Sequence, residues 1–289
     1  MSISPSQVYA GIDWLTLTTG PTADADEAYQ RARALVIEQQ DTGERLRPWA
    51  SHGYKGFSVP HLRCGHKDGD VLIELSGHLA DRYWREFLPL AKNVSRIDPQ
   101  VTCTYGHEVR DLAQQAYDAP AVRMSPNLPA ISKRIFLEKD GGQTCYLGAP
   151  TSDRRARLYD KHAESRGEYP ENTWRYELQV RRALGSDLAR LIDRSDDVRG
   201  AIASVVRSFF SSHGVSPWFS ADGPTVFSPA RIARSDLSKW LDWLRSSVRP
   251  GVRRWNDRAT RRAILDAIGL EDGDQAAGLV IAGDDAGRN

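Results

Sequence analysis

The segment 144–182 holds the residues of this 289-residue chain whose types and spacing are best suited to chemistry. Tyr159 stands between Arg157 and Lys161 in a predicted strand, and Glu177 follows in a second one. Because strand side chains alternate between faces, the tyrosine and its two cations share one face. A phenol, with an ordinary pKa of about 10, needs cations or a metal nearby to become a nucleophile. The pattern therefore indicates nucleophilic attack by Tyr159 on a nucleic-acid phosphate, with a phosphate-binding shell around it.

Two other tyrosines compete for the role of nucleophile. Tyr146 lies in a Cys-Tyr-Leu-Gly run without adjacent basic residues, and Tyr176 points away from Arg175 and Glu177 on its own strand. A structural tyrosine on a half-buried strand is the plainer interpretation of Tyr159, and the residues alone leave it open.

Three carboxylates interrupt apolar strands, namely Glu74, Asp98 and Glu177. Carboxylates inside strands are disfavoured unless they are paired or bound to a metal. Hard oxygen ligands suit Mg²⁺ or Mn²⁺, which neutralise charge on a scissile phosphate. The three acids therefore predict a divalent-metal site. The alternative is that they pair with arginines, such as Arg96 with Asp98 and Arg175 with Glu177, both at i, i+2.

Several common functional classes lack their motifs in this chain. There is no phosphate-binding loop of the P-loop type, no Gly-x-Ser-x-Gly elbow, and no His-apolar-His strand around His61 and His66. The three cysteines show no metal-site spacing. No signal peptide and no apolar run of membrane-spanning length is evident, so we expect a cytoplasmic protein with no membrane association.

The C-terminal part of the chain carries a basic segment followed by an acidic tail. Residues 227–269 predict a helical segment whose arginines track phosphates, or alternatively a solvated basic helix face. Residues 270–289 are rich in Gly, Ala and Asp and predict disorder. The net charge of +1 is therefore unevenly distributed along the chain.

Hydrophobic periodicity predicts an α+β fold with curved, mostly antiparallel sheets flanked by helices. Pro99 marks its strand as an edge or bulged strand. The order of elements predicts two similar strand-rich halves, 8–107 and 130–212, within one domain spanning 1–269. Strands are expected at 8–18, 49–60, 70–76, 94–105, 132–137, 143–147, 156–161 and 173–181, and helices at 23–40, 79–90, 109–117, 187–210, 236–246 and 260–268.

Short motifs in a fixed order resemble the replication initiation factor family. That family includes initiators of rolling-circle plasmids, related phage initiators and relaxases of integrative elements. The resemblance departs from the usual pattern where Thr102 replaces a second acid and where Ala149-Pro150-Thr151 replaces a more basic run. The matching pieces are 11–18, 74–77, 95–98, Tyr146-Leu147-Gly148, Ser152, 157–161, Glu164, 174–177, 240–244 and 248–252.

The resemblance implies an endonuclease that nicks one DNA strand at an origin. Tyr159 would form a 5′-phosphotyrosine and release a 3′ hydroxyl that primes rolling-circle synthesis. It implies that Asp98 and Glu177, with Glu74, hold Mg²⁺ or Mn²⁺, while Arg157, Lys161 and Arg175 stabilise the phosphate charge. The alternative function is a non-catalytic DNA-binding regulator of a mobile element.

The partners implied are origin DNA, as a hairpin or a single-stranded nick site, and a host helicase, with a homodimer left open. The side chains expected to bind the DNA are Arg154, Arg155, Arg249, Arg253, Arg254 and Trp255.

Overall fold

The computed structural model describes residues 5–40, 45–120, 133–139, 141–217 and 219. All of them belong to the first of two compact units, Met1–Ser228, and none belongs to the second, Pro229–Asn289. The predicted basic segment 227–269, its two helices and the acidic tail 270–289 therefore lie outside the described residues.

The described residues form one ten-stranded sheet in which every neighbouring pair is antiparallel. Its strand order is β2-β3-β4-β5-β1-β6-β10-β9-β8-β7. The strands are β1 (Gln7–Thr18), β2 (Arg47–Ser51), β3 (Tyr54–Val59), β4 (Leu62–Lys67), β5 (Asp70–Ser76), β6 (Asn93–Thr104), β7 (Arg134–Lys139), β8 (Gly142–Leu147), β9 (Arg154–Asp160) and β10 (Thr173–Arg181).

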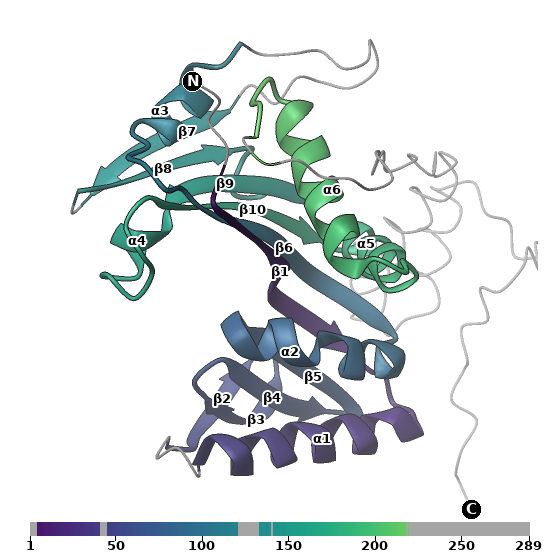
Figure 1. The fold of residues 1–289 in the computed structure, drawn as a ribbon. Helices are drawn as coiled ribbons and strands as arrows, with labels where there is room; N and C mark the ends of the chain where they lie inside the picture. The colour runs from purple at the N-terminus through teal and green to yellow at the C-terminus, as the bar shows by residue number, and fades with distance from the viewer. Residues whose placement is uncertain (1–4, 41–44, 121–132, 140, 218, 220–289) are drawn as a thin grey trace, which may run out of the picture. The chain divides into compact units, whose positions relative to one another are not determined.

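Helices pack against this sheet (Figure 1). Apolar side chains of the strands are buried in the core. α2 covers β1 and β5, α1 covers β4 and β5, α5 and α6 cover β6 and β10, and α3 covers β7 to β9. The antiparallel sheet with helices confirms the predicted α+β class. The helices are α1 (Ala23–Gln40), α2 (Gly77–Phe87), the 3₁₀ turn η1 (Leu88–Leu90), α3 (Leu112–Asp118), α4 (Lys161–Glu164), α5 (Ala183–Asp193) and α6 (Val198–Ser211).

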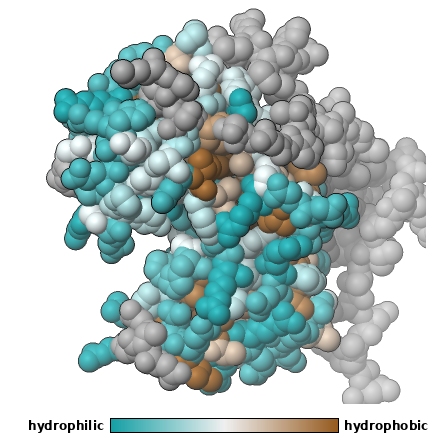
Figure 2. Space-filling view, in the orientation of Figure 1, coloured by the Kyte–Doolittle hydropathy of each residue, from teal (hydrophilic) through white to brown (hydrophobic). Residues whose placement is uncertain are grey.

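The alternation of side chains along the central strands separates an apolar face from a polar one. On β10, Tyr176 packs edge-on against Phe210 of α6, while Arg175 and Glu177 take the opposite direction. On β6, buried Ile97 likewise alternates with Asp98. The sheet surface opposite the helices thus carries charged side chains, here called the polar face. Hydrophilic residues also cover most of the described surface visible in Figure 2.

One sequence of elements occurs twice along the chain. A strand, a helix, four strands in a meander and a helix run from β1 to α2 and again from β6 to α5, with the short α4 inserted between β9 and β10. In each set the last meander strand returns beside the first strand, so β5 lies next to β1 and β10 next to β6. The predicted halves, 8–107 and 130–212, differ from this order because they count β6 with the first set.

Two elements differ from the expectations. β4 and α4 were not predicted, because β4 carries two charged residues and α4 spans a single turn.

Pro99 was expected to mark an edge or bulged strand. β6 lies at the centre of the sheet, so it is not an edge strand. A β-bulge does lie opposite Pro99, where Asp13 is an extra residue in β1 between the pairs Ile12↔Pro99 and Trp14↔Asp98.

The burial of Ile97 beneath the polar face generates a stability prediction. Ile97 is fully buried, so Ile97→Ala leaves a cavity and should lower the free energy of unfolding by about 2–5 kcal/mol. The matched control is Ile37→Ala on α1, because Ile37 is 63% exposed and should change stability by less than about 0.5 kcal/mol. Urea denaturation followed by circular dichroism measures both, and equal losses would contradict the packing described.

Candidate active site on the polar face

A cross-strand ion pair joins two of the predicted site residues. Glu177 on β10 is the direct register partner of Arg157 on β9. The Arg157 Nη2 atom donates to the Glu177 Oε2 atom at 2.7 Å. The Tyr159 hydroxyl donates to the same carboxylate oxygen at 3.3 Å. The strand register therefore brings the predicted nucleophile, one predicted cation and one predicted acid together.

Tyr159 has two cations beside its ring: Arg157, which alternation along β9 placed on its face, and Lys161, which was predicted on the same strand but begins α4. The guanidinium of Arg157 lies 4.4 Å from the centre of its ring and the ammonium of Lys161 lies 5.8 Å from it. Only 2% of the residue is exposed. Burial, followed by the negative charge of Glu177, raises the pKa of Tyr159 well above its ordinary value, against the lowering effect of Arg157 and Arg175. The phenol is therefore neutral in this arrangement, contrary to the expectation that its cations favour a phenolate.

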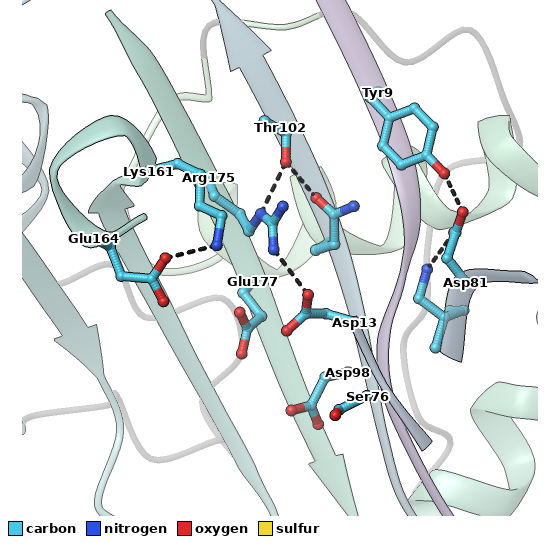
Figure 3. Close-up of polar contacts among 12 residues, drawn as sticks. Tyr9, Asp13, Ser76, Asp81, Asp98, Thr102, Lys161, Glu164, Arg175 and Glu177 are labelled. Atoms are coloured by element: carbon cyan, nitrogen blue, oxygen red, sulfur yellow. Dashed lines mark hydrogen bonds and ion pairs between the residues drawn. The ribbon is translucent and has the colours of Figure 1, made fainter. Parts of the chain in front are cut away.

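Arg175 is held by three partners on the polar face. It donates to the Thr102 hydroxyl at 2.9 Å and to the Asp13 carboxylate at 2.8 Å (Figure 3). It also donates to the Tyr169 hydroxyl at 3.1 Å. Thr102, which replaces an acid in the family resemblance, thus acts as a neutral acceptor for Arg175. Arg175 is buried and each of its three guanidinium nitrogens donates one of these hydrogen bonds, so it links β1, β6 and the segment before β10.

Asp98 is a fully buried carboxylate with an arginine partner. Both of its oxygens accept from the Arg96 Nε atom at 3.0 Å, and Arg96 also lies 4.2 Å from the centre of the Trp14 ring. The pKa of Asp98 is raised to about 7, mainly by burial and in smaller part by the negative charges of Glu177 and Asp13, against the lowering effect of Arg96. Burial outweighs the ion pair, because water no longer solvates the charged form.

Glu74 lies away from the other two predicted metal ligands. It is on β5, with β1 between that strand and β6, and it pairs with Arg63 of β4. Asp13 takes its place beside Asp98 and Glu177 in Figure 3. Sequence reasoning missed Asp13, and its position after the buried Ile12 resembles that of Asp98 after Ile97. That repeated Ile-Asp pair was the available signal.

The carboxylates have the right chemistry for Mg²⁺ or Mn²⁺, but their present partners compete with a metal. Among the described residues, no group of three or more His, Cys, Asp or Glu side chains is arranged to hold a metal ion. Asp98 and Glu177 each face an arginine instead, as the ion-pair alternative predicted for Asp98. Glu177 pairs with Arg157 rather than with Arg175. A divalent cation does not fit this arrangement unless Arg96 and Arg157 move.

A pocket of about 470 Å³ opens beside these residues on the polar face. Lys161 lines it and donates to Glu164 at 2.6 Å. Tyr146 and Arg155 also line it, with the guanidinium 4.0 Å from the centre of the tyrosine ring. The further residues around the pocket are Asp13, Trp14, His61, Ser76, Gly77, Arg96, Ala156, Arg157, Glu177 and Gln179.

The rival tyrosines occupy different settings. Tyr146 is half-buried and lies in the wall of this pocket, with the basic neighbour that its own strand lacks supplied by Arg155 of β9. Tyr176 is buried among aromatic rings on the helix-covered face and takes no part in the site. Tyr159 and Tyr146 thus remain the two candidates, one closer to the acids and the other more accessible.

The predicted DNA-binding residues divide between the two units. Arg154 and Arg155 are half-buried at the start of β9, and of these Arg155 lines the pocket. Arg249, Arg253, Arg254 and Trp255 lie outside the described residues.

Comparison with known proteins identifies a solved structure with a similar fold. No family model and no curated protein matches the chain. A solved structure of a rolling circle replication initiator protein from Geobacillus stearothermophilus is similar, with a TM-score of 0.53 and 20% sequence identity over 72% of this chain and 86% of that one. The two proteins share a fold. None of the helices in the described residues is long and apolar enough to cross a bilayer.

The raised pKa of Asp98 generates a pH prediction. Its folded value of about 7 exceeds the ordinary value of 3.8, so the folded state binds more protons and the contribution of Asp98 to stability falls as pH rises from about 4 to about 7. Asp98→Asn lacks this dependence. The difference in the free energy of unfolding, wild type minus Asp98→Asn, should therefore decrease by roughly a few kcal/mol as pH rises through this range. Urea denaturation in buffer with a chelator measures it, and parallel pH profiles would contradict the shift.

Proposed function

We propose that this protein nicks one strand of DNA at a replication or transfer origin, using Tyr159 as the nucleophile. The observation that carries the proposal is the meeting of Tyr159, Glu177 and Arg157 beside a pocket lined by four cationic residues and three carboxylates. The shared fold with a rolling circle replication initiator supports it. The protein would act in the cytoplasm on supercoiled DNA, with a host helicase and a second copy of the chain as further proposed partners.

The reaction is a transesterification at a phosphodiester. The Tyr159 oxygen would attack phosphorus and form a 5′-phosphotyrosine, while the bond to the 3′ oxygen breaks and that oxygen takes a proton from water. Because the buried phenol is neutral, it must lose its proton during attack. Glu177 Oε2 lies 3.3 Å from the phenol oxygen and is the acceptor at hand.

The arginines and the lysine would stabilise charge that develops on the phosphate. Arg157 now neutralises Glu177, and Lys161 neutralises Glu164 at the pocket wall. A bound phosphate would draw both cations toward its oxygens and loosen their ion pairs. Arg175, which donates to Asp13 and Thr102, would keep its positive charge next to the site and neutralise Asp13.

A bound Mg²⁺ or Mn²⁺ would supply additional neutralisation of the phosphate charge. We propose Asp98 and Glu177 as its ligands, once DNA has drawn Arg96 and Arg157 away. Glu74, the third predicted ligand, is excluded from this site because it lies across β1 and pairs with Arg63. Nicking should then be lost in a chelator. Nicking that continues in EDTA would assign the charge stabilisation to the arginines alone.

The second candidate function is a DNA-binding regulator without catalysis. Two observations favour it: Tyr159 is 2% exposed, and Asp98, Glu177 and Glu74 each form an ion pair with an arginine. This function predicts salt-sensitive DNA binding with no covalent adduct.

The nucleophile is tested by removing single hydroxyl groups. Wild type and variants are incubated with Mg²⁺ or Mn²⁺ and a supercoiled plasmid carrying the DNA around the protein's own coding sequence. Tyr159→Phe should reduce open circles with attached protein by at least about 10³-fold, because loss of the attacking atom removes the covalent route.

Tyr146→Phe is the matched control and should retain adduct formation within about tenfold, because it loses only a pocket-lining hydroxyl. The reverse result would move the nucleophile to Tyr146. Adduct from neither wild type nor any variant, with DNA binding intact, would favour the regulator.

A further inference from the structure

A second pocket, more basic than the first, adjoins it on the same sheet. It has a volume of about 300 Å³ and lies over β3, β4 and β5. Three arginines line it, namely Arg45, Arg47 and Arg63. Trp14, His61 and Ser76 line both pockets, so the two are neighbours that share a wall.

This pocket contains a copy of the ion pair at the candidate active site. Arg63 on β4 is the register partner of Glu74 on β5 and forms a salt bridge with it. Arg157 on β9 stands in the same relation to Glu177 on β10. The strands are equivalent by sheet order, because β4 and β5 occupy the places in the first set that β9 and β10 occupy in the second.

The copy lacks the nucleophile. At the candidate active site, the residue two positions after Arg157 is Tyr159, which lies opposite Arg175 in the strand register. In the second pocket, the residue two positions after Arg63 is Gly65, which lies opposite Leu72. A side chain at Gly65 would meet the Trp49 ring at 2.9 Å and the Tyr54 Cβ atom at 3.1 Å. The aromatic residues thus occupy the space of the missing phenol. The second pocket keeps an arginine for phosphate and has no group there to attack one.

The charge of the second pocket favours an anion. Glu74 is its one acidic lining residue, and Arg63 already pairs with it. Arg45 and Arg47 are exposed, and neither forms an ion pair with another described residue. Among the described residues no carboxylate neutralises these two guanidinium groups, which suits them to contact phosphate oxygens.

Trp14 gives the shared wall an aromatic surface. The residue is half-buried, its indole N–H donates to Thr16 at 2.9 Å, and the Arg96 guanidinium lies 4.2 Å from the ring centre. An aromatic ring between two pockets that carry arginines is a combination suited to single-stranded nucleic acid, because a base stacks while its phosphates contact cations. A duplex keeps its bases paired and cannot use the ring in this way.

We propose that the second pocket binds the backbone of the single DNA strand that continues from the candidate active site, as a non-catalytic copy of that site. The strand would pass Trp14 and place its next phosphates against Arg47 and Arg45. This inference rests on the proposed function for the identity of the strand, while binding itself is measured separately from nicking.

The test is the double variant Arg45→Ala/Arg47→Ala in the full-length protein. Fluorescence anisotropy measures its affinity for a fluorescein-labelled single strand of about 20 nucleotides at several salt concentrations. Affinity should fall about tenfold. The slope of log K against log salt should become shallower by about 0.7 for each phosphate that the variant no longer neutralises.

The matched control is Arg33→Ala/Arg190→Ala, which removes the same charge from exposed positions on α1 and α5. It should lose less than about twofold in affinity with the salt slope unchanged. Equal losses in the two double variants would overturn the proposal, because they would show a net-charge effect. An equal loss on a duplex of the same sequence would also overturn it, because the site would then not select a single strand.

Nicking of supercoiled plasmid by the same proteins separates this inference from the proposed function. If the Arg45/Arg47 variant loses single-strand affinity and wild type forms no adduct, the subsite stands and the nicking function fails. If wild type forms the adduct and the variant binds single strands like the control, nicking stands and the subsite fails.

Discussion

The Arg157–Glu177 pair is the interaction on which the site depends. A carboxylate that is 3% exposed on a sheet face is costly to bury unless a cation and hydrogen bonds compensate it. Arg157 supplies the cation and Tyr159 supplies a hydrogen bond, so one carboxylate fixes both side chains. The same requirement explains why Arg96 faces Asp98 and Arg175 faces Asp13. Charge balance among buried groups thus determines where the reactive side chains lie.

The same ion pairs determine what a DNA phosphate would have to displace on binding. The phenol is buried and neutral, and the acids are paired with arginines, so the described arrangement is a closed one. A phosphate would compete for Arg157 and Lys161, free the carboxylates and expose the phenol in one event. Strong electrostatic pairing in the absence of DNA is then a means of keeping the nucleophile inactive, in the account proposed here.

Much of the fold was predictable from the sequence, and the site only in part. The strands 70–76 and 173–181 were predicted at the bounds of β5 and β10 because their apolar alternation and flanking residues were clear. Local periodicity placed Arg157 and Tyr159 on one face. It could not show that Glu74 lies away from Asp98, that a bulge inserts Asp13, or that Arg155 reaches Tyr146. Those facts depend on strand order and register, which long-range pairing decides.

Mass spectrometry of the protease-digested adduct, formed on a substrate that traps the cleaved strand, tests the proposed covalent link between Tyr159 and DNA most directly. We expect a nucleotide attached to the peptide that contains Tyr159, with fragmentation placing it on that residue. Attachment at Tyr146, or at any other residue, would show that Tyr159 is not the nucleophile.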